Sequence, residues 1–320
     1  MLSLDNAKKQ HKANFWDVII IGGGPAGCAA AMVLARSKRR VLLIDGGKQR
    51  NLKSHGLRNF ITRDGILPPD FLKLAYEDLA KYDVTYHQQQ IVSAEPKEYG
   101  FDVKDNAGKT YSSRKLLLAT GVTDEIPPVP GMKELWGCAV FHCPFCDGYE
   151  CCEYNVGLYA HAHNGYGMAI ALRHLSEHVT LYTDGAHYLK VKQREELHKR
   201  GINIVTKRIS HLVHQDEKLQ AVALNTGTEM PCEYMFVHHN FSINGALLKQ
   251  LNCRTSKKGA AITNRKQETS ILGVYVAGDA SYDVHFVSVA AAEGVKAGVA
   301  IHNALLQEDN REALAVKDPE

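Results

Sequence analysis

A chain of 320 residues, 45% apolar and 23% charged, is long enough for two globular domains that each have their own core. Its net charge of +3 is too small for strongly basic nucleic-acid binding but leaves room for an acidic protein partner. The polar N-terminus lacks the apolar segment of a secretion signal. The apolar run at residues 18–35 contains four glycines and Pro25, which favours a buried strand and turn over a membrane span. We therefore expect a cytoplasmic protein with no nucleic-acid and no membrane partner.

The segment DVIIIGGGPAGCAAAMVLARSKRRVLLID, residues 17–45, predicts a strand, a glycine turn, a helix and a second strand. The pattern Gly22-x-Gly24-x-x-Gly27 follows the first strand, and the second strand ends in Asp45. This context is typical of a dinucleotide-binding unit, in which Gly22 permits the tight turn, Gly24 lets the backbone approach a pyrophosphate and Gly27 lets helix and strand pack closely. The helix N-terminus attracts phosphates, and Asp45 can accept hydrogen bonds from a ribose. The alternative is a doubly wound fold without a nucleotide.

Further along the chain, short strands are expected from about residue 98 to Ala119-Thr120-Gly121, before a polar, proline-rich hinge at residues 122–131. Residues 154–184 repeat the strand, turn, helix and strand order, which predicts a second dinucleotide-type domain. Near the C-terminus a strand is followed by Gly278-Asp279 and a long helix of small residues. The charged tail from residue 307 is expected to fray.

Five of the eight cysteines lie between Cys138 and Cys152, which favours a site over scattered core thiols. A metal site is one interpretation, because Cys138-x4-Cys143-x2-Cys146 matches the opening spacing of a plant-type iron–sulfur loop, with His142, Cys151 or Cys152 as further ligands. No second C-x-x-C motif supports it, and a structural disulfide does not suit a cytosolic chain. The favoured interpretation is a redox dithiol, in which Cys143 and Cys146 close and reopen a disulfide. Cys28, Cys232 and Cys253 are expected in the core.

These motifs occur in the order found in low-molecular-weight thioredoxin reductases, which the chain resembles from about residue 17 to 306. The segments DGGKQRN, TRDGILPPDFL and CPFCDGYE are still more similar to a branch of thioredoxin-reductase-like flavoproteins that includes dithiol oxidases. The resemblance implies an α/β fold with two Rossmann-like three-layer domains. An FAD-binding domain of residues 1–122 and 240–320 would be split by an inserted, degenerate pyridine-nucleotide-type domain at 123–239. It also implies a homodimer.

The resemblance assigns roles to individual residues. Cys146 would face the flavin, Cys143 would exchange with the substrate, and Asp147 would protonate a leaving thiolate; no resident metal is implied. Asp279 would bind the ribitol chain, and the helix start near Phe286 and Val287 would stabilise negative charge on the reduced flavin. The full set expected to bind FAD is Gly22, Gly24, Pro25, Ala26, Gly27, Asp45, Asn59, Ile91, Ala119, Thr120, Gly121, Gly278, Asp279, Phe286 and Val287.

The sequence departs from the family in two places. Dithiol-oxidase relatives often carry a histidine where this chain has Asp147, which leaves the substrate preference of this chain open. His142 and Glu150 are possible additional residues that assist the reaction. Cys151 and Cys152 are either resolving thiols or small core residues. In the inserted domain, the loop Ala160-His161-Ala162-His163-Asn164-Gly165 has alanines in place of two glycines, and Thr183-Asp184-Gly185 replaces the cationic cluster that binds a 2′-phosphate. His161, His163 and Tyr166 could instead stack on another planar ligand.

The sequence therefore predicts an FAD-dependent thiol–disulfide oxidoreductase that NADPH does not drive well. Electrons would pass between the flavin, Cys143 and Cys146, and a thioredoxin-like protein, a ferredoxin or a small dithiol. One alternative is a thioredoxin reductase linked to NADPH or NADH whose motif has drifted. The other is a flavin-binding redox sensor without catalytic turnover.

Overall fold

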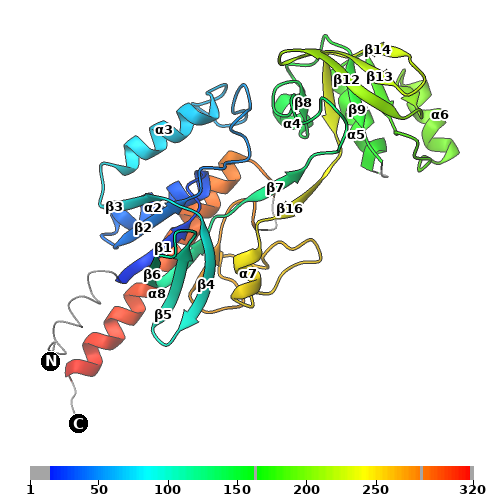
Figure 1. Cartoon of the computed structure of the whole chain (residues 1–320). Helices are drawn as coiled ribbons and strands as arrows, with labels where there is room; N and C mark the ends of the chain where they lie inside the picture. The colour runs from blue at the N-terminus through cyan, green and yellow to red at the C-terminus, as the bar shows by residue number, and fades with distance from the viewer. Residues whose placement is uncertain (1–14, 162–163, 282–283, 318–320) are drawn as a thin grey trace. The chain divides into compact units, whose positions relative to one another are not determined.

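The computed structural model describes residues 15–161, 164–281 and 284–317. The chain forms two compact units (Figure 1). The first combines residues 1–52, 69–123 and 242–320, and the second combines Lys53–Pro68 with Asp124–Phe241. Both units contain a parallel sheet with helices, so the expected α/β fold with two Rossmann-like domains is confirmed. No helix in the described parts of the chain is both long enough and apolar enough to span a membrane.

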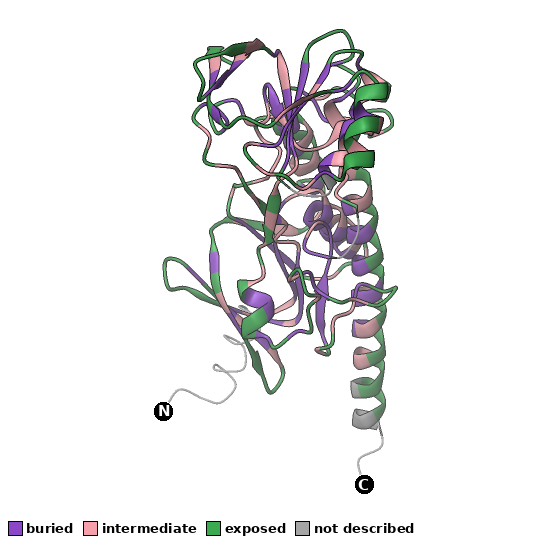
Figure 2. Cartoon of the chain, turned by 90° about the vertical axis from the view of Figure 1, so that its right-hand side faces the viewer, coloured by how far each residue is buried: buried purple, intermediate pink, exposed green. Residues whose placement is uncertain are grey.

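The first unit is built on a sheet with the strand order β3-β2-β1-β6-β5-β4, and β17 also pairs with β6. Strands β3, β2, β1, β6 and β17 run parallel, whereas β4, β5 and the start of β6 form an antiparallel meander. In the central strands β1, β2 and β6, residues 18–21, 41–44 and 116–118 are continuous apolar runs that are buried, as parallel strands covered by helices require (Figure 2). The strands are β1 (Phe15–Ile21), β2 (Val41–Asp45), β3 (Val84–Gln88), β4 (Ile91–Lys97), β5 (Gly100–Asp105), β6 (Thr110–Leu118) and β17 (Val274–Val276).

Four helices belong to this unit: α2 (Pro25–Arg36), α3 (Pro68–Leu79), α7 (Ala246–Gln250) and α8 (Val287–Lys317). Helix α2 packs on α8 through small residues. A Cβ atom at Gly294 would lie 2.1 Å from the carbonyl oxygen of Ala26, so the two backbones approach as closely as glycine allows. This contact fixes the start of α2, which is also the end of the Gly22–Gly27 turn.

The charged end of α8 is helical in the structure, so the expectation of a frayed tail was wrong as far as Lys317. Arg39 and Arg114 both form ion pairs with Asp309, and Arg114 and Lys115 pair with Glu308. These cations lie on or next to β2 and β6, so the α8 turn that carries Glu308 and Asp309 is bound to the sheet of the first unit.

The second unit has a five-stranded parallel sheet with the order β11-β10-β9-β15-β8 and a three-stranded antiparallel sheet, β12-β13-β14. Its strands are β8 (Val140–Phe141), β9 (Val156–Tyr159), β10 (Val179–Tyr182), β11 (Asn203–Val205), β12 (Ile209–Gln215), β13 (Lys218–Leu224), β14 (Glu229–Pro231) and β15 (Tyr234–Val237). Its helices are α4 (Pro144–Asp147), α5 (Asn164–Leu175) and α6 (Val191–Lys199). Two segments connect the units, β7 (Val122–Glu125) and β16 (Asn240–Ile243), and they pair as a two-stranded sheet.

The grouping differs from the expected domains at Lys53–Pro68, which the sequence interpretation left in the FAD-binding domain. In the structure this loop packs on the second unit. The Asn59 amide donates to the carbonyl of Phe145, Arg58 pairs with Glu150, and His55 pairs with Glu217. No sequence pattern predicts such contacts, because the partners lie 86 to 162 residues apart along the chain.

The contact between α2 and α8 can be tested with two matched substitutions in α8. Gly294→Ala places a methyl group 2.1 Å from a backbone oxygen that cannot move aside, whereas Gly298→Ala meets Val33 Cβ at 3.0 Å and the Ala30 carbonyl oxygen at 3.1 Å. Both variants gain the same helix propensity. We expect Gly294→Ala to be less stable than Gly298→Ala by at least about 2 kcal/mol in denaturant titrations followed by circular dichroism. Equal midpoints would contradict the close approach.

Candidate active site

The two cysteines of the C-x-x-C motif lie at the start of α4. Cys143 is the residue before the helix, Pro144 occupies its first position, and the backbone N–H groups of Cys146 and Asp147 donate to the carbonyl of Cys143. This turn brings the Sγ atoms of Cys143 and Cys146 to 2.7 Å from each other. A disulfide bond is about 2.05 Å long, so a small side-chain movement closes it.

The two thiols do not have equal environments. The hydrogen bond from Cys146 lowers the pKa of Cys143, and backbone N–H groups of Cys146 and Phe145 lower it further, against the effects of burial and of Asp147. Cys143 is thus the thiol whose negative charge the turn stabilises. It is also only partly buried, as an attacking sulfur must be.

Asp147 ends α4 and holds its proton more tightly than an ordinary carboxyl group. Burial, followed by the negative charge of Glu150, raises the pKa of Asp147 to about 7, and Arg58 opposes this shift. Arg58 also pairs with Glu150 at 3.0 Å. A carboxyl group with this pKa can donate a proton near neutral pH, which is the property a general acid needs.

The loop Lys53–Pro68 supplies two of the residues at the dithiol. Arg58 is described above, and Asn59 adopts a left-handed backbone conformation with φ of 61° while its amide donates to the Phe145 carbonyl at 2.9 Å. The expected role of Asn59 in binding FAD stays a prediction. The sequence analysis did not predict a role for Arg58, because no motif marks this cation within its loop.

The other cysteines divide into buried and exposed thiols. Cys28, Cys232 and Cys253 are buried, as expected. Cys151 is also buried and donates to the carbonyl of Asp147, and burial raises its pKa, whereas Cys152 is exposed. Among the residues that the structure describes, Cys138 groups with His55 and Glu217 rather than with Cys143 and Cys146, which does not favour the iron–sulfur interpretation.

His142 lies in an aromatic cluster directly before Cys143. Its ring stacks on Trp136 with centroids 6.1 Å apart, and His239 packs edge-on against both rings. His239 in turn bonds to Asp124 at 2.7 Å, and both side chains are almost fully buried. The sequence suggested His142 as a helper, but only the fold brings Trp136 and His239 to it.

In the first unit, the glycine turn between β1 and α2 has the geometry expected of a dinucleotide loop. Gly22 has φ of +110°, and a Cβ atom there would lie 2.2 Å from the oxygen of Ala119. A Cβ atom at Gly27 would lie 1.9 Å from the oxygen of Gly22. Beside Gly24 there is open space, and no side chain in the described part of the chain caps α2. The turn therefore leaves room where a phosphate would approach, next to Ala119-Thr120-Gly121.

Asp45 lies at the end of β2 with its carboxylate against this turn. It accepts a hydrogen bond from the N–H of Gly23 at 3.0 Å, and its second oxygen accepts from Gln49 at 2.6 Å and from Tyr76 at 3.4 Å. Gln49 and Tyr76 were not expected from the sequence. Ribose hydroxyls could replace their donor groups.

A second turn follows β17 in the same sheet. Gly278 has φ of +77° and donates its N–H to Glu293, which also accepts from the hydroxyl of Ser281. Asp279 is partly exposed beside Arg50, which also contacts His285. Buried Glu293 was missed, although an acid inside the run AAAEGVKAGVA was a usable signal.

The remaining predicted residues lie at the same edge or near it. Thr120 and Gly121 are held by three hydrogen bonds with Asn244, Ile91 begins β4 in the core, and α8 begins at Val287 beside Phe286. The open space at Gly24, the uncapped α2 and the two acids fit a bound dinucleotide. Its contacts in detail stay a prediction.

The corresponding loop of the second unit is different. Ala160 is fully buried, Tyr188 fills the space beside Gly165, and Ala162 and His163 lie outside the described residues. Asp184 accepts hydrogen bonds from the hydroxyl of Tyr159 and the N–H of Ile209, and His161 contacts both side chains. Exposed Arg208 lies beside Gly185, a cation that the sequence pattern did not indicate.

Comparisons with known proteins agree with this geometry. The family model described as pyridine nucleotide-disulphide oxidoreductase matches residues 16–294. Thioredoxin reductase tcpT of Claviceps purpurea is 30% identical over 83% of this chain and 87% of its own length, and thioredoxin reductase sirT of Leptosphaeria maculans is 29% identical over 90% and 94%. The crystal structure of HlmI superposes with a TM-score of 0.90 at 31% identity and covers 94% of this chain and 96% of that chain.

The match over most of the chain agrees with the C-x-x-C dithiol and the glycine turn described above. The chain therefore belongs to the pyridine nucleotide-disulphide oxidoreductase family, as a thioredoxin reductase-like, flavin-dependent disulfide oxidoreductase.

Proposed function

We propose that the protein is an FAD-dependent thiol–disulfide oxidoreductase that exchanges electrons between the Cys143–Cys146 dithiol and an external dithiol or disulfide, and that NADPH is a poor electron donor for it. The observation that carries the proposal is the dithiol itself: two sulfur atoms 2.7 Å apart beside a carboxyl group whose pKa is about 7. When bound at the first unit, FAD would supply two-electron redox chemistry.

The residues of the second unit can perform the exchange as balanced steps. The thiolate of Cys143 attacks a substrate disulfide, a mixed disulfide forms, and the leaving thiolate takes the proton of Asp147. The Asp147 carboxylate then takes the thiol proton of Cys146, and the Cys146 thiolate attacks the Cys143 sulfur. The second substrate thiolate leaves with that proton as a thiol, and a Cys143–Cys146 disulfide remains. Two electrons have passed to the substrate, and the reverse sequence oxidises an external dithiol.

The proposal that NADPH is a poor donor rests on the loop between β9 and α5. Ala160 stands where the first unit has Gly22, the glycine that permits the tight turn, and the Tyr188 hydroxyl lies against Gly165. Asp184 places a negative charge where a 2′-phosphate would bind. Arg208 is the one observation here that favours the alternative, an NADPH-linked reductase, because it offers a cation beside the same turn.

The proposed partners follow from the same chemistry. The names of the relatives suggest a thioredoxin-like protein as the dithiol partner, and the net charge of +3 also suits an acidic ferredoxin; a small dithiol is the third candidate. We also propose a homodimer in a reducing, cytoplasmic compartment, where a dithiol of this kind is kept open.

The dithiol assignment predicts that Cys143 is required for disulfide exchange and that Cys152 is not. In pre-reduced protein mixed anaerobically with a chromogenic aromatic disulfide, Cys143→Ser should slow thiol release at least about 100-fold, because the stabilised thiolate is lost. The measurement belongs in a Cys152→Ser background, since exposed Cys152 would react by itself. Cys152→Ser alone should release the thiol as fast as the unchanged protein does. If the fast thiol release disappears in Cys152→Ser, the assignment is wrong.

The Asp147 carboxyl group predicts a pH dependence. The acid must be protonated, so its contribution is present below a pH of about 7 and is lost as the pH rises through that value. The rate of exchange with an aliphatic disulfide, whose basic leaving thiolate needs a proton, should therefore have a descending limb near pH 7. Asp147→Asn should remove this limb and lower the rate at pH 6 by about 10²–10⁴-fold.

Glu150→Gln provides the control for this pH profile. It removes the charge that raises the Asp147 pKa and leaves Arg58, which lowers it, so the descending limb should move to lower pH. Arg58→Gln should move it to higher pH. A limb that stays in place in both variants would show that another group controls it.

The nucleotide loop predicts that neither NADPH nor NADH reduces the bound flavin quickly. Losing two charge-assisted phosphate contacts weakens binding by about 10²–10⁴-fold. Anaerobic stopped-flow mixing with millimolar nucleotide should show flavin bleaching much slower than about one per second. Fast bleaching that Arg208→Ala abolishes would instead establish the NADPH-linked alternative.

A further inference from the structure

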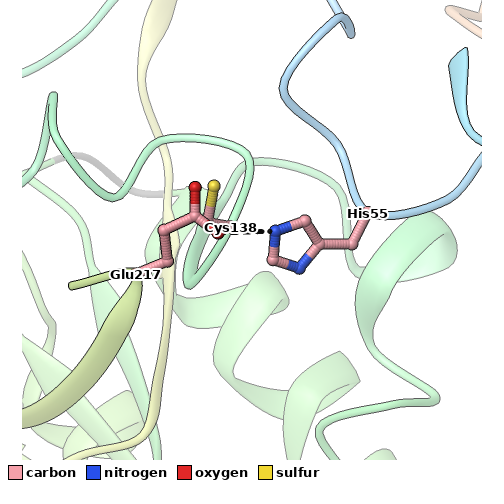
Figure 3. Close-up of side chains that lie close together, drawn as sticks. All are labelled: His55, Cys138 and Glu217. Atoms are coloured by element: carbon pink, nitrogen blue, oxygen red, sulfur yellow. Dashed lines mark hydrogen bonds and ion pairs between the residues drawn. The ribbon is translucent and has the colours of Figure 1, made fainter. Parts of the chain in front are cut away.

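Three side chains from distant parts of the second unit meet away from the dithiol. His55 comes from the loop Lys53–Pro68, Cys138 precedes β8, and Glu217 lies in the turn between β12 and β13 (Figure 3). His55 Nε2 lies 3.2 Å from Glu217 Oε2, and the three donor atoms all lie within 4.8 Å of one another. The cluster joins residues up to 162 positions apart, so no spacing in the sequence indicates it.

The cluster has one buried and two exposed members. Cys138 is buried, with its thiol directed to the Lys53 carbonyl at 3.7 Å, whereas the His55 and Glu217 side chains are 61% and 68% exposed. Burial, followed by the charge of Glu217, raises the pKa of Cys138. An imidazole and a carboxylate from two exposed segments thus lie next to one buried thiol, which leaves solvent access on the side of the exposed groups.

The loop that carries His55 is held in position by backbone packing. Gly137, with φ of +87°, lets the backbone of Lys53 approach so closely that a Cβ atom there would lie 3.2 Å from the Cβ of Lys53. The main chain directly before Cys138 therefore lies against the main chain two residues before His55. Only the exposed ends of two side chains have to move when a ligand binds.

The donor set is one that zinc prefers. Zinc binds thiolate sulfur at about 2.3 Å and imidazole nitrogen or carboxylate oxygen at about 2.0–2.2 Å, usually as a tetrahedron. Donor atoms at the corners of such a tetrahedron lie about 3.3–3.6 Å apart. The separation of 3.2 Å between His55 and Glu217 is close to that range, and rotation of the two exposed side chains can bring the whole set into it.

We propose that His55, Cys138 and Glu217 bind one zinc ion, with a water molecule in the fourth position. Binding releases the thiol proton of Cys138 to solvent and leaves the thiolate on the metal. This site is separate from Cys143 and Cys146 and departs from the sequence expectation of no resident metal. The ion would fasten the loop Lys53–Pro68 to the β12–β13 turn, and the same loop carries Arg58 and Asn59 to the dithiol.

The test uses the full flavin-containing chain in a Cys143→Ser/Cys146→Ser background, because the redox dithiol would also bind zinc. Zinc titration against a chromogenic chelator should give one ion per chain. Cys138→Ala, His55→Ala and Glu217→Gln should each weaken binding at least about 10-fold. His174→Ala and Cys152→Ser, which remove an exposed imidazole and an exposed thiol elsewhere, should leave binding unchanged.

Cobalt is a second probe, because Co²⁺ binds the same ligands as zinc and its visible absorption spectrum depends on them. Tetrahedral Co²⁺ should give absorption bands at longer wavelengths than the flavin, and these should disappear in Cys138→Ala. The proposal fails if the parent protein binds no zinc in the micromolar range or if His55→Ala, which changes an exposed side chain, binds zinc as tightly as the parent. Since neither readout involves thiol–disulfide exchange, the result does not depend on the proposed function.

Discussion

The close contact between α2 and α8 is the constraint on which the first unit depends. A side chain larger than hydrogen at Gly294 would overlap the Ala26 carbonyl, so the two helices can pack only at this separation. Helix α2 begins at the glycine turn after β1, and α8 begins just beyond the Gly278–Asp279 turn after β17. One helix contact therefore fixes two turns that are about 250 residues apart in the chain, at the same edge of one sheet. Glu293 strengthens the arrangement, because from within α8 it holds the N–H of Gly278.

In the second unit, opposite electrostatic shifts prepare neighbouring groups for different tasks. The start of α4 and the hydrogen bond from Cys146 favour negative charge on Cys143, whereas burial and Glu150 keep the proton on Asp147. The pKa values of the nucleophile Cys143 and the acid Asp147 are thus shifted in opposite directions, each in the direction that its task requires. Arg58 and Glu150 set how far Asp147 is shifted, and Arg58 comes from a loop that the sequence order placed in the other domain.

The two glycine turns illustrate how one fold supports different chemistry. The turn after β1 has Gly22 at its first position and open space at Gly24, while the loop after β9 has the buried Ala160 at the matching first position. The second unit retains its sheet, because its core depends on apolar strands and not on the loop. What it presents instead is the dithiol, an aromatic cluster around His142, and the group of His55, Cys138 and Glu217.

The sequence by itself determined the fold class, the glycine turn, the second α/β unit and the dithiol. Each of these follows from a local sequence pattern: apolar runs of strand length, glycines at fixed spacing and two cysteines separated by two residues. The core positions of Cys28, Cys232 and Cys253 also followed from this pattern. Only the tertiary structure decided that Lys53–Pro68 packs beside α4, that the charged end of α8 stays helical against Arg39 and Arg114, and that Glu293 supports Gly278. It also brought His55, Cys138 and Glu217 together. These features depend on contacts between side chains that are far apart in the chain. The burial and the electrostatic environment of such side chains are defined only once the strands have paired and the sheets have formed.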